Sequence, residues 1–199
     1  MASGKNGWTR VALAALHKQA RSLSACEPGA LWQGILEIEL RRLDGLGILL
    51  TELESKLDAM ALADRRTELV RTVPGVGLRT AEVIVTVLDD AKRFKNLRAV
   101  SAYAGLTPRR YQSGNIDRQG RISKCGNPLL RRMLNQAAWS AVRCDPRMRD
   151  TFMRICGGNR ARKKQAIVAV MRKLLVVCWA VMRDERAYER RPGSSGVAA

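Results

Sequence analysis

Residues 69–84 have the sequence LVRTVPGVGLRTAEVI, and this stretch decides the fold of the chain. Apolar residues precede and follow a turn at Gly75-Val76-Gly77, and a small residue, Ala81, stands where two helices would cross. Glycines let the backbone turn tightly, so the stretch predicts a helix-hairpin-helix whose second helix begins with outward N–H groups. Together with the helix dipole, such groups form a phosphate-binding site that does not distinguish between base sequences. A helical corner used only for packing is the alternative.

Two helices are expected upstream of this turn, over residues 9–23 and 30–61. In the second, six apolar residues step by three and four alternately, as in the a/d seam of a coiled coil. These residues are Leu43, Leu46, Leu50, Leu53, Leu57 and Met60. The seam is shorter than three heptads, so an ordinary core-facing helix and an oligomerisation element both fit it.

Further helices are expected downstream of the turn. A short one covers 96–104, a longer one runs from Asn127-Pro128 to Asp145-Pro146, and two more cover 147–155 and 160–189. No strand is predicted. The fold class is therefore all-α: a long coiled-coil-like helix precedes a helical domain with a helix-hairpin-helix. The domains expected are 1–61, 62–189 and a disordered tail over 190–199.

Charge is distributed unevenly along the chain. The sequence has 36 Lys and Arg against 18 Asp and Glu, yet residues 1–60 have seven of each. Residues 91–173 have 21 basic and three acidic side chains, which indicates a polyanionic partner such as a nucleic-acid backbone. A membrane surface is the competitor, but the cations are spread over several elements. The apolar stretch 166–182 contains Arg172 and Lys173, so we expect a buried helix there and no membrane span.

Cysteine usage argues against a zinc site or a disulfide framework. Five cysteines form no CxxC pair, and His17 is the only histidine. The odd count and the lack of a signal peptide indicate a reducing cytoplasm.

A serine in a glycine-flanked, arginine-rich segment is the candidate nucleophile. Gly114 follows Ser113, and a hydroxyl exposed among cations suits attack on a phosphodiester, because the cations would offset charge developing at phosphorus. The candidate catalytic residues are Ser113, Arg109, Arg110, Arg121 and Lys124. A simple Ser-Gly turn is the alternative.

Other residues are candidates for binding nucleic acid, and four of them stand in the first turn of the last helix. They are Gly75, Val76, Gly77, Arg79, Arg118, Arg131, Arg160, Arg162, Lys163 and Lys164.

From about residue 43 to 188, the chain resembles the C-terminal transposase domain of the insertion-sequence 110/116/902 family. Six ordered blocks support the resemblance. They are Val73-Pro74-Gly75-Val76-Gly77, Phe94-Lys95-Asn96, Gly105-Leu106-Thr107-Pro108 with Gln112-Ser113-Gly114, Ile122-Ser123-Lys124-Cys125-Gly126-Asn127, Leu130-Arg131, and Arg172-Lys173-Leu174.

The resemblance implies a serine recombinase chemistry. In the family, the serine at the position of Ser113 forms a covalent phosphoserine link to DNA, and a structured bridge RNA chooses target and donor. An upstream RuvC-like domain binds magnesium through four acidic residues, and a coiled-coil segment, matching residues 30–61, assembles protomers.

Residues 1–42 are too few for a RuvC-like domain, so we expect a fragment, a truncated gene or a remnant that is inactive alone. Magnesium is expected only with that domain. The expected partners are DNA, a structured guide RNA and further protomers or a full-length transposase, in a prokaryotic cytoplasm at the nucleoid. A non-catalytic DNA- or RNA-binding regulator is the alternative, and an assembly module without activity is a third hypothesis.

Overall fold

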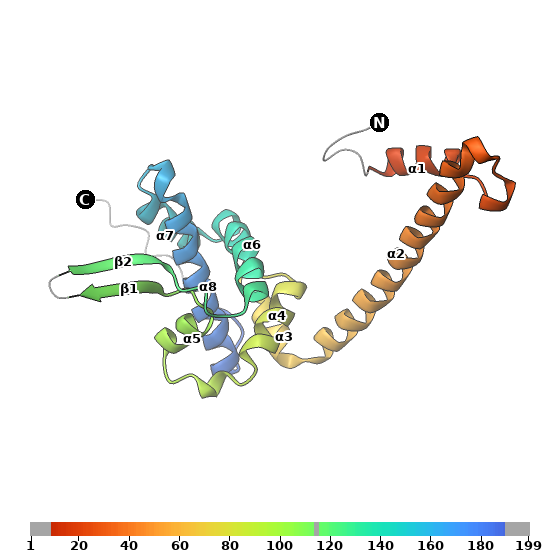
Figure 1. Ribbon diagram of the computed structural model, residues 1–199. Helices are drawn as coiled ribbons and strands as arrows, with labels where there is room; N and C mark the ends of the chain where they lie inside the picture. The colour runs from red at the N-terminus through yellow and green to blue at the C-terminus, as the bar shows by residue number, and fades with distance from the viewer. Residues whose placement is uncertain (1–8, 114–115, 190–199) are drawn as a thin grey trace. The chain divides into compact units, whose positions relative to one another are not determined.

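The computed structural model describes residues 9–113 and 116–189, and between residues 110 and 119 it describes the backbone alone. These residues form eight α-helices, four short 3-10 turns and one two-stranded sheet (Figure 1). The all-α prediction is confirmed. The chain divides into two compact units, Met1–Asp58 and Ala59–Ala199. The tail expected at 190–199 lies outside the described residues.

The N-terminal unit is built on α1 (Arg10–Gln19) and on α2 (Leu31–Ala63), which continues into the second unit. The first helix ends four residues earlier than expected, because the backbone is extended at Ala20, and two 3-10 turns follow it. These turns are Leu23–Ala25 and Pro28–Ala30. The predicted long helix over 30–61 is confirmed within two residues at each end.

The apolar seam of α2 is exposed. Its six residues, from Leu43 to Met60, keep between 44% and 71% of their surface in solvent. Among the described residues of its unit, the seam therefore packs into no core, unlike the core-facing helix considered as one alternative.

The C-terminal unit holds the remaining six helices (Figure 1). They are α3 (Arg65–Arg71), α4 (Leu78–Leu88), α5 (Leu97–Tyr103), α6 (Pro128–Cys144), α7 (Pro146–Cys156) and α8 (Lys163–Asp184). The start of α6 is confirmed, since the Asn127 side chain accepts the first free N–H groups of the helix. Asp145 ends α6 and caps α7 in the same way.

The expected bounds of the last helix, 160–189, are wrong at both ends. Arg160–Arg162 form a 3-10 turn, because the Asn159 side chain accepts the N–H of Ala161 and so starts a separate turn. At the other end Glu185 adopts a left-handed conformation with φ of +51°, which stops the helix at Asp184.

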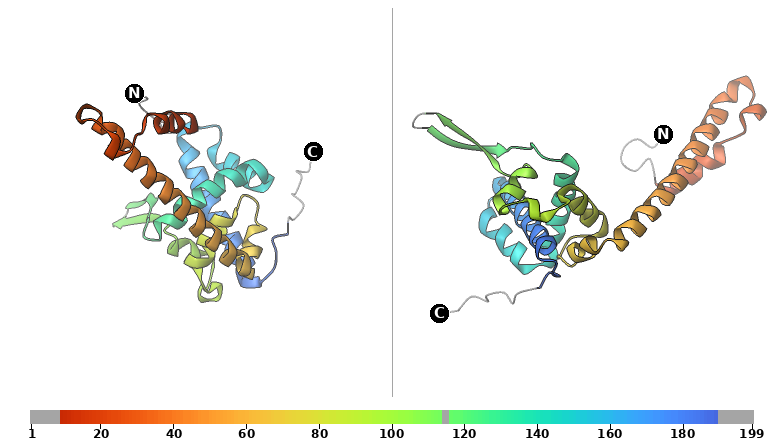
Figure 2. Two further views of the ribbon diagram at one scale, coloured as in Figure 1. Left: turned by 90° about the vertical axis from the view of Figure 1, so that its right-hand side faces the viewer. Right: turned by 90° about the horizontal axis from the view of Figure 1, so that it is seen from below.

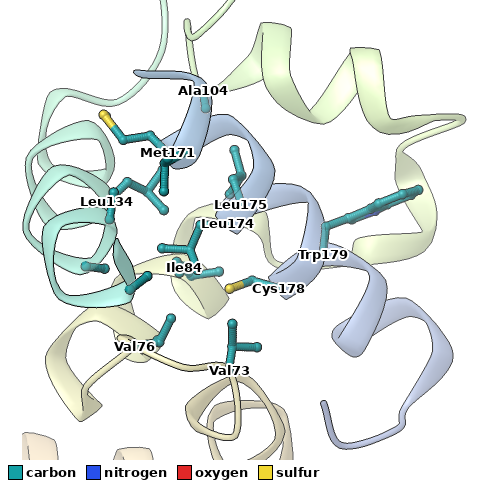
Figure 3. Packing of buried hydrophobic residues seen from close by; sticks show 14 of the residues in the cluster. Val73, Val76, Ile84, Ala104, Leu134, Met171, Leu174, Leu175, Cys178 and Trp179 are labelled. Atoms are coloured by element: carbon teal, nitrogen blue, oxygen red, sulfur yellow. The ribbon is translucent and has the colours of Figure 1, made fainter. Parts of the chain in front are cut away.

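Helix α8 is the centre of the C-terminal unit, and it contacts α3, α4, α5, α6 and α7 (Figure 2). Leu174 of α8 meets Ile84 of α4 and Leu134 of α6 in a close-packed cluster (Figure 3). The indole N–H of Trp179 donates to the carbonyl of Ala91 at 2.8 Å, so its one polar atom is satisfied. By length and composition the α8 segment is apolar enough to cross a membrane, but ten of its residues are buried inside the protein.

A β-hairpin stands where no strand was predicted. Strand β1 (Pro108–Ser113) pairs antiparallel with β2 (Ile116–Ile122), and the hairpin projects from the helices (Figures 1 and 2). Both strands are largely polar and lack the alternation of apolar and polar residues that marks a half-buried strand. Their pairing rests on backbone hydrogen bonds between the two strands, which the residue pattern does not reveal.

Candidate nucleic-acid interface

The base of the hairpin is fixed by a close approach of two backbones. Lys124 N–H donates to the carbonyl of Gly105 at 3.1 Å. A Cβ atom on Gly126 would lie 2.5 Å from the carbonyl carbon of Ala104, and Gly105 has φ of +68°. Only glycine fits these two positions without displacing backbone atoms. The segment after β2 is therefore clamped against the segment before β1.

Arg131 reinforces this clamp from α6. Its guanidinium Nη1 donates to the carbonyl oxygens of Ala104 at 3.3 Å and Gly126 at 2.5 Å. The side chain is half-buried, so the structure gives it a positioning role beneath the hairpin. The expected contact of Arg131 with nucleic acid stays a prediction.

Ser113 is the last residue of β1, and its backbone pairs with that of Ile116. Gly114, which was expected to keep the serine hydroxyl open, lies outside the described residues, and so does the Ser113 side chain. The backbone alone places Ser113 beside the turn of the hairpin, at the end remote from the clamp.

The five cations near Ser113 in sequence are spread along the hairpin. Arg109, Arg121 and Lys124 are exposed at its base, where Arg109 donates to the carbonyl of Ser123 at 3.1 Å. Four strand residues at about 3.4 Å each put Arg109 roughly 13 Å from the serine backbone.

Two further cations have backbones nearer the turn of the hairpin. Arg118 pairs with Tyr111, two positions from Ser113, and Arg110 pairs with Gln119. The side chains of Arg110 and Arg118 lie outside the described residues. Of these five cations, Arg118 therefore has the backbone position nearest to the serine.

The predicted phosphate turn between α3 and α4 has a buried and an exposed part. Gly75 has φ of +86°, and a Cβ there would lie 2.5 Å from the Ala141 amide nitrogen of α6. Val76 is buried in the core, and Arg79 pairs with Glu82 at 2.9 Å. These three residues have packing or pairing roles, and their expected contacts with phosphate stay predictions.

Gly77 is the exposed residue of this turn. It caps α4 with no side-chain hydrogen bond, and an added Cβ would meet no atom within 4 Å. Gly77 itself is exposed, and the helix dipole makes this end of α4 positive, as a phosphate site requires. Use of the turn for phosphate binding stays a prediction.

Four cations at the start of α8 are exposed together. The 3-10 turn carries Arg160 and Arg162, and Lys163 and Lys164 open the helix. No acidic residue stands in this first turn. Cations at a helix N-terminus repel the positive end of its dipole, so a bound anion would relieve an unfavourable field.

Two cations in the middle of α8 are used inside the protein. Arg172 donates through Nε to the buried hydroxyl of Ser101 at 3.2 Å, and Lys173 donates to the Thr151 hydroxyl at 2.7 Å. Burial, and then the nearby Arg147, lowers the pKa of Lys173. This pair joins α8 to α5 and α7, so its part in the family motif is structural.

Helix α6 exposes four polar side chains that the sequence did not single out as candidates: Arg132, Asn135, Gln136 and Arg143. They recur at helical spacing in a helix without any acidic residue. This pattern is visible in the sequence, but the Leu and Ala residues of the opposite face favour a packing role for the helix.

No group of three or more His, Cys, Asp or Glu side chains that could hold a metal ion occurs among the described residues. The magnesium ion implied by the resemblance therefore finds no set of ligands in this part of the chain. Any ligands would have to come from other residues.

Comparisons with known proteins identify the family of the chain. Residues 67–153 match the model of the Transposase IS116/IS110/IS902 family, a range that includes the turn, the hairpin and α6. A probable family 20 transposase of Pseudomonas aeruginosa is 32% identical over 190 residues, covering 93% of this chain and 56% of the relative.

Two further relatives match a smaller part of the chain. The pilin gene-inverting protein of Moraxella lacunata is 34% identical over 127 residues, covering 63% of this chain and 39% of the relative. The transposase of insertion sequence element IS1111A of Coxiella burnetii is 31% identical over 138 residues, covering 68% of the chain and 38% of the relative. The chain thus spans about two fifths to just over half of the length of these three curated relatives.

Proposed function

Since the chain belongs to the IS116/IS110/IS902 family of transposases, we propose that it supplies the serine-bearing part of an enzyme that cuts and rejoins DNA. The position of Ser113 carries this proposal. It ends a strand of a projecting hairpin that is clamped at its base, and the hairpin lies within the residues that match the family. A nucleophile at such a place can reach a phosphodiester without displacing the helical core.

The proposed reaction is a transesterification at Ser113. Its Oγ attacks phosphorus, an Oγ–P bond forms, and one P–O bond of the DNA backbone breaks. The proton lost by the serine hydroxyl is balanced by the proton gained by the departing DNA hydroxyl. The phosphodiester energy is kept in the serine link, so a DNA hydroxyl can reverse the step without ATP.

The cations of the hairpin take different parts in this proposal. Arg118, whose backbone is near Ser113, and Arg110 are the first candidates to offset the charge on phosphorus. Arg109, Arg121 and Lys124, at the base, are better placed to hold the DNA strand that leads into the site. In this proposal, magnesium comes with the acidic residues of the RuvC-like domain that the resemblance implies.

Assembly and guidance are also part of the proposal. The exposed seam of α2 suits contact with another protomer or with a full-length transposase, because burying its leucines is favourable. The positive excess beyond residue 60 suits DNA and a structured guide RNA at the nucleoid. The pilin gene-inverting relatives and the insertion-sequence transposases make DNA the first substrate to test.

A chimera tests the assignment of Ser113. This chain would replace the matching part of the Pseudomonas aeruginosa relative, and the product would be incubated with labelled DNA carrying the relative's element ends. A covalent protein–DNA adduct is expected, absent in Ser113→Ala and retained in Ser123→Ala, the matched serine at the hairpin base. An adduct that persists in Ser113→Ala, or that maps to Tyr111, would overturn the assignment.

A non-catalytic nucleic-acid-binding regulator is the second candidate. It is supported by the exposed cations of the C-terminal unit, such as the four at the start of α8. Such a binder would compete with a full-length transposase for DNA and would be indifferent to Ser113→Ala. Inhibition of a relative's transposition by both the natural chain and this variant would support it.

A further inference from the structure

The two faces of α6 differ in chemistry. Five of its residues are buried against the core: Leu130, Leu134, Ala137, Ala138 and Ala141. Eight others are exposed, and five of these have charged, amide or aromatic side chains: Arg132, Asn135, Gln136, Trp139 and Arg143. At 100° per residue these five span an arc of about 100° opposite the core. The outward face of α6 is defined by these five exposed residues.

The polar side chains of this face are unengaged within the protein. Across the residues that the structure describes, no hydrogen bond or ion pair is found for the side chains of Arg132, Asn135, Gln136 or Arg143. Arg149 is a contrast, since it donates to two backbone carbonyls at the end of α6. The outward face thus keeps its donors free for an external partner.

Trp139 adds an exposed aromatic ring to the centre of this face. One side of the ring packs against Phe152 with centroids 5.6 Å apart, and 40% of the residue remains in solvent. This tilted contact, with the two ring planes at 58°, restricts the ring before any partner binds. A large ring held in place costs little conformational entropy when it is covered.

The chemistry of the face fits duplex DNA. A B-form major groove is about 12 Å wide and admits one α-helix. Arg132 and Arg143 are separated by about 16 Å along the axis, enough to reach phosphates on both sides of the groove. Between them, Asn135 and Gln136 have the amide pattern that pairs with adenine. The Trp139 ring can cover a thymine methyl group or a sugar.

We propose that the outward face of α6 lies in the major groove of duplex DNA, with the arginines on phosphates and the two amides on base edges. This inference rests on the proposed action on DNA, but it needs no catalysis by Ser113. It adds a source of base-sequence preference, since cations that contact phosphates alone would bind all sequences equally.

Binding of the full chain to 20-bp duplexes tests the arginines. R132A/R143A should reduce the slope of log affinity against log salt by about two, because two phosphate contacts are lost. The matched control R10A/R21A removes the same charge from exposed positions of the N-terminal unit and should leave the slope unchanged. Equal effects of the two double variants would overturn the proposal.

Selection from a randomised 20-bp pool tests the amides. The natural chain should enrich A·T-containing sites, and N135A/Q136A should bind those sites on the order of tenfold more weakly with an unchanged salt slope. The selection should then become less sequence-dependent. If the natural chain enriches no sequence, base reading by this face is excluded.

Methylation by dimethyl sulfate locates the groove independently of any variant. It reacts with guanine N7 in the major groove, so the bound chain should protect guanines in the enriched sites. Unprotected guanines, or equal competition by an RNA duplex or a single strand, would overturn the proposal. The chimera's adduct at Ser113 would then still stand, so the two proposals fail separately.

Discussion

Helices α2 and α8 both carry apolar side chains at helical spacing, yet α2 leaves Leu46 53% exposed and α8 buries Leu174 completely. The surrounding charge differs as well, because residues 1–60 are neutral and the whole positive excess lies beyond them. Periodicity thus tells which side of a helix faces a partner, but not where that partner is. For α8 the partner is the rest of its own unit, whereas α2 leaves the apolar side chains of its seam in solvent among the described residues.

The largest expected effect is on binding, and it tests the charge difference between the regions. If the full chain neutralises about six phosphates, its affinity for a random 20-bp duplex should fall roughly a thousandfold between 50 and 200 mM salt. Filter binding would measure this. A flat response would remove nucleic acid as the partner of the C-terminal unit.

The four cations at the start of α8 allow the salt dependence to be assigned to one of the two units. Two variants of equal charge are compared: R160A/R162A/K163A/K164A in one unit and R10A/K18A/R21A/R42A in the other. The first should lower the salt slope by about three to four, since each phosphate contact contributes about 0.9. The second should not change it, and equal slopes in both would make the charge difference irrelevant to binding.

The next effect is on stability and is confined to the packed unit. Gly75→Ala and Gly126→Ala each force a Cβ against backbone of a neighbouring segment, so each should lower the free energy of unfolding by about 2–4 kcal/mol. Urea unfolding would measure the loss. Gly77→Ala, at an open position, is the control with less than about 1 kcal/mol. If neither Gly75→Ala nor Gly126→Ala lowered the free energy of unfolding, the close backbone approaches at these two glycines would be contradicted.

A smaller effect is expected at the exposed start of α4. Gly77→Val adds a branched side chain where a phosphate would approach, and it should weaken binding of all sequences alike, on the order of tenfold. Filter binding with several unrelated duplexes measures this, and far-UV circular dichroism checks the fold. A loss limited to some sequences, or no loss in a folded variant, would make the turn purely structural.

The smallest expected effect is on the stability of α2, the exposed helix in the comparison. Gly45 and Gly47 stand inside α2 with no atom near a built Cβ, so alanine at each should stabilise the helix by up to about 1 kcal/mol. Amide hydrogen exchange over α2 should slow, while exchange in α8 stays the same. Slower exchange in α8 as well would show that the two units unfold together.

The helices and their ends were predictable because local chemistry sets them. Asn127 and Asp145 each accept N–H groups at the next helix start, and both are followed by proline, so the sequence alone locates α6 and α7. The hairpin was not predictable in this way, since each strand finds its partner in the backbone of the other.

The candidate site was predictable only in part, because neighbours of identical charge have different surroundings. Arg131 reaches the carbonyl of Ala104, 27 residues away in sequence, whereas Arg132 next to it faces solvent. No sequence pattern distinguishes the two. Similarly, Gly75 and Gly77 look alike in the turn, and only the packing of α6 makes the first a structural residue.

The clamp at the base of the hairpin also bears on how such proteins can diversify. Gly105, Gly126 and Arg131 hold the chain at the two points where the hairpin leaves and re-enters the helical unit. Residues 108–122, which form the hairpin, lie between those two fixed points. Because Ile122 packs against the helical core, a hairpin of another length or sequence is expected to leave the helices unchanged where that residue is kept.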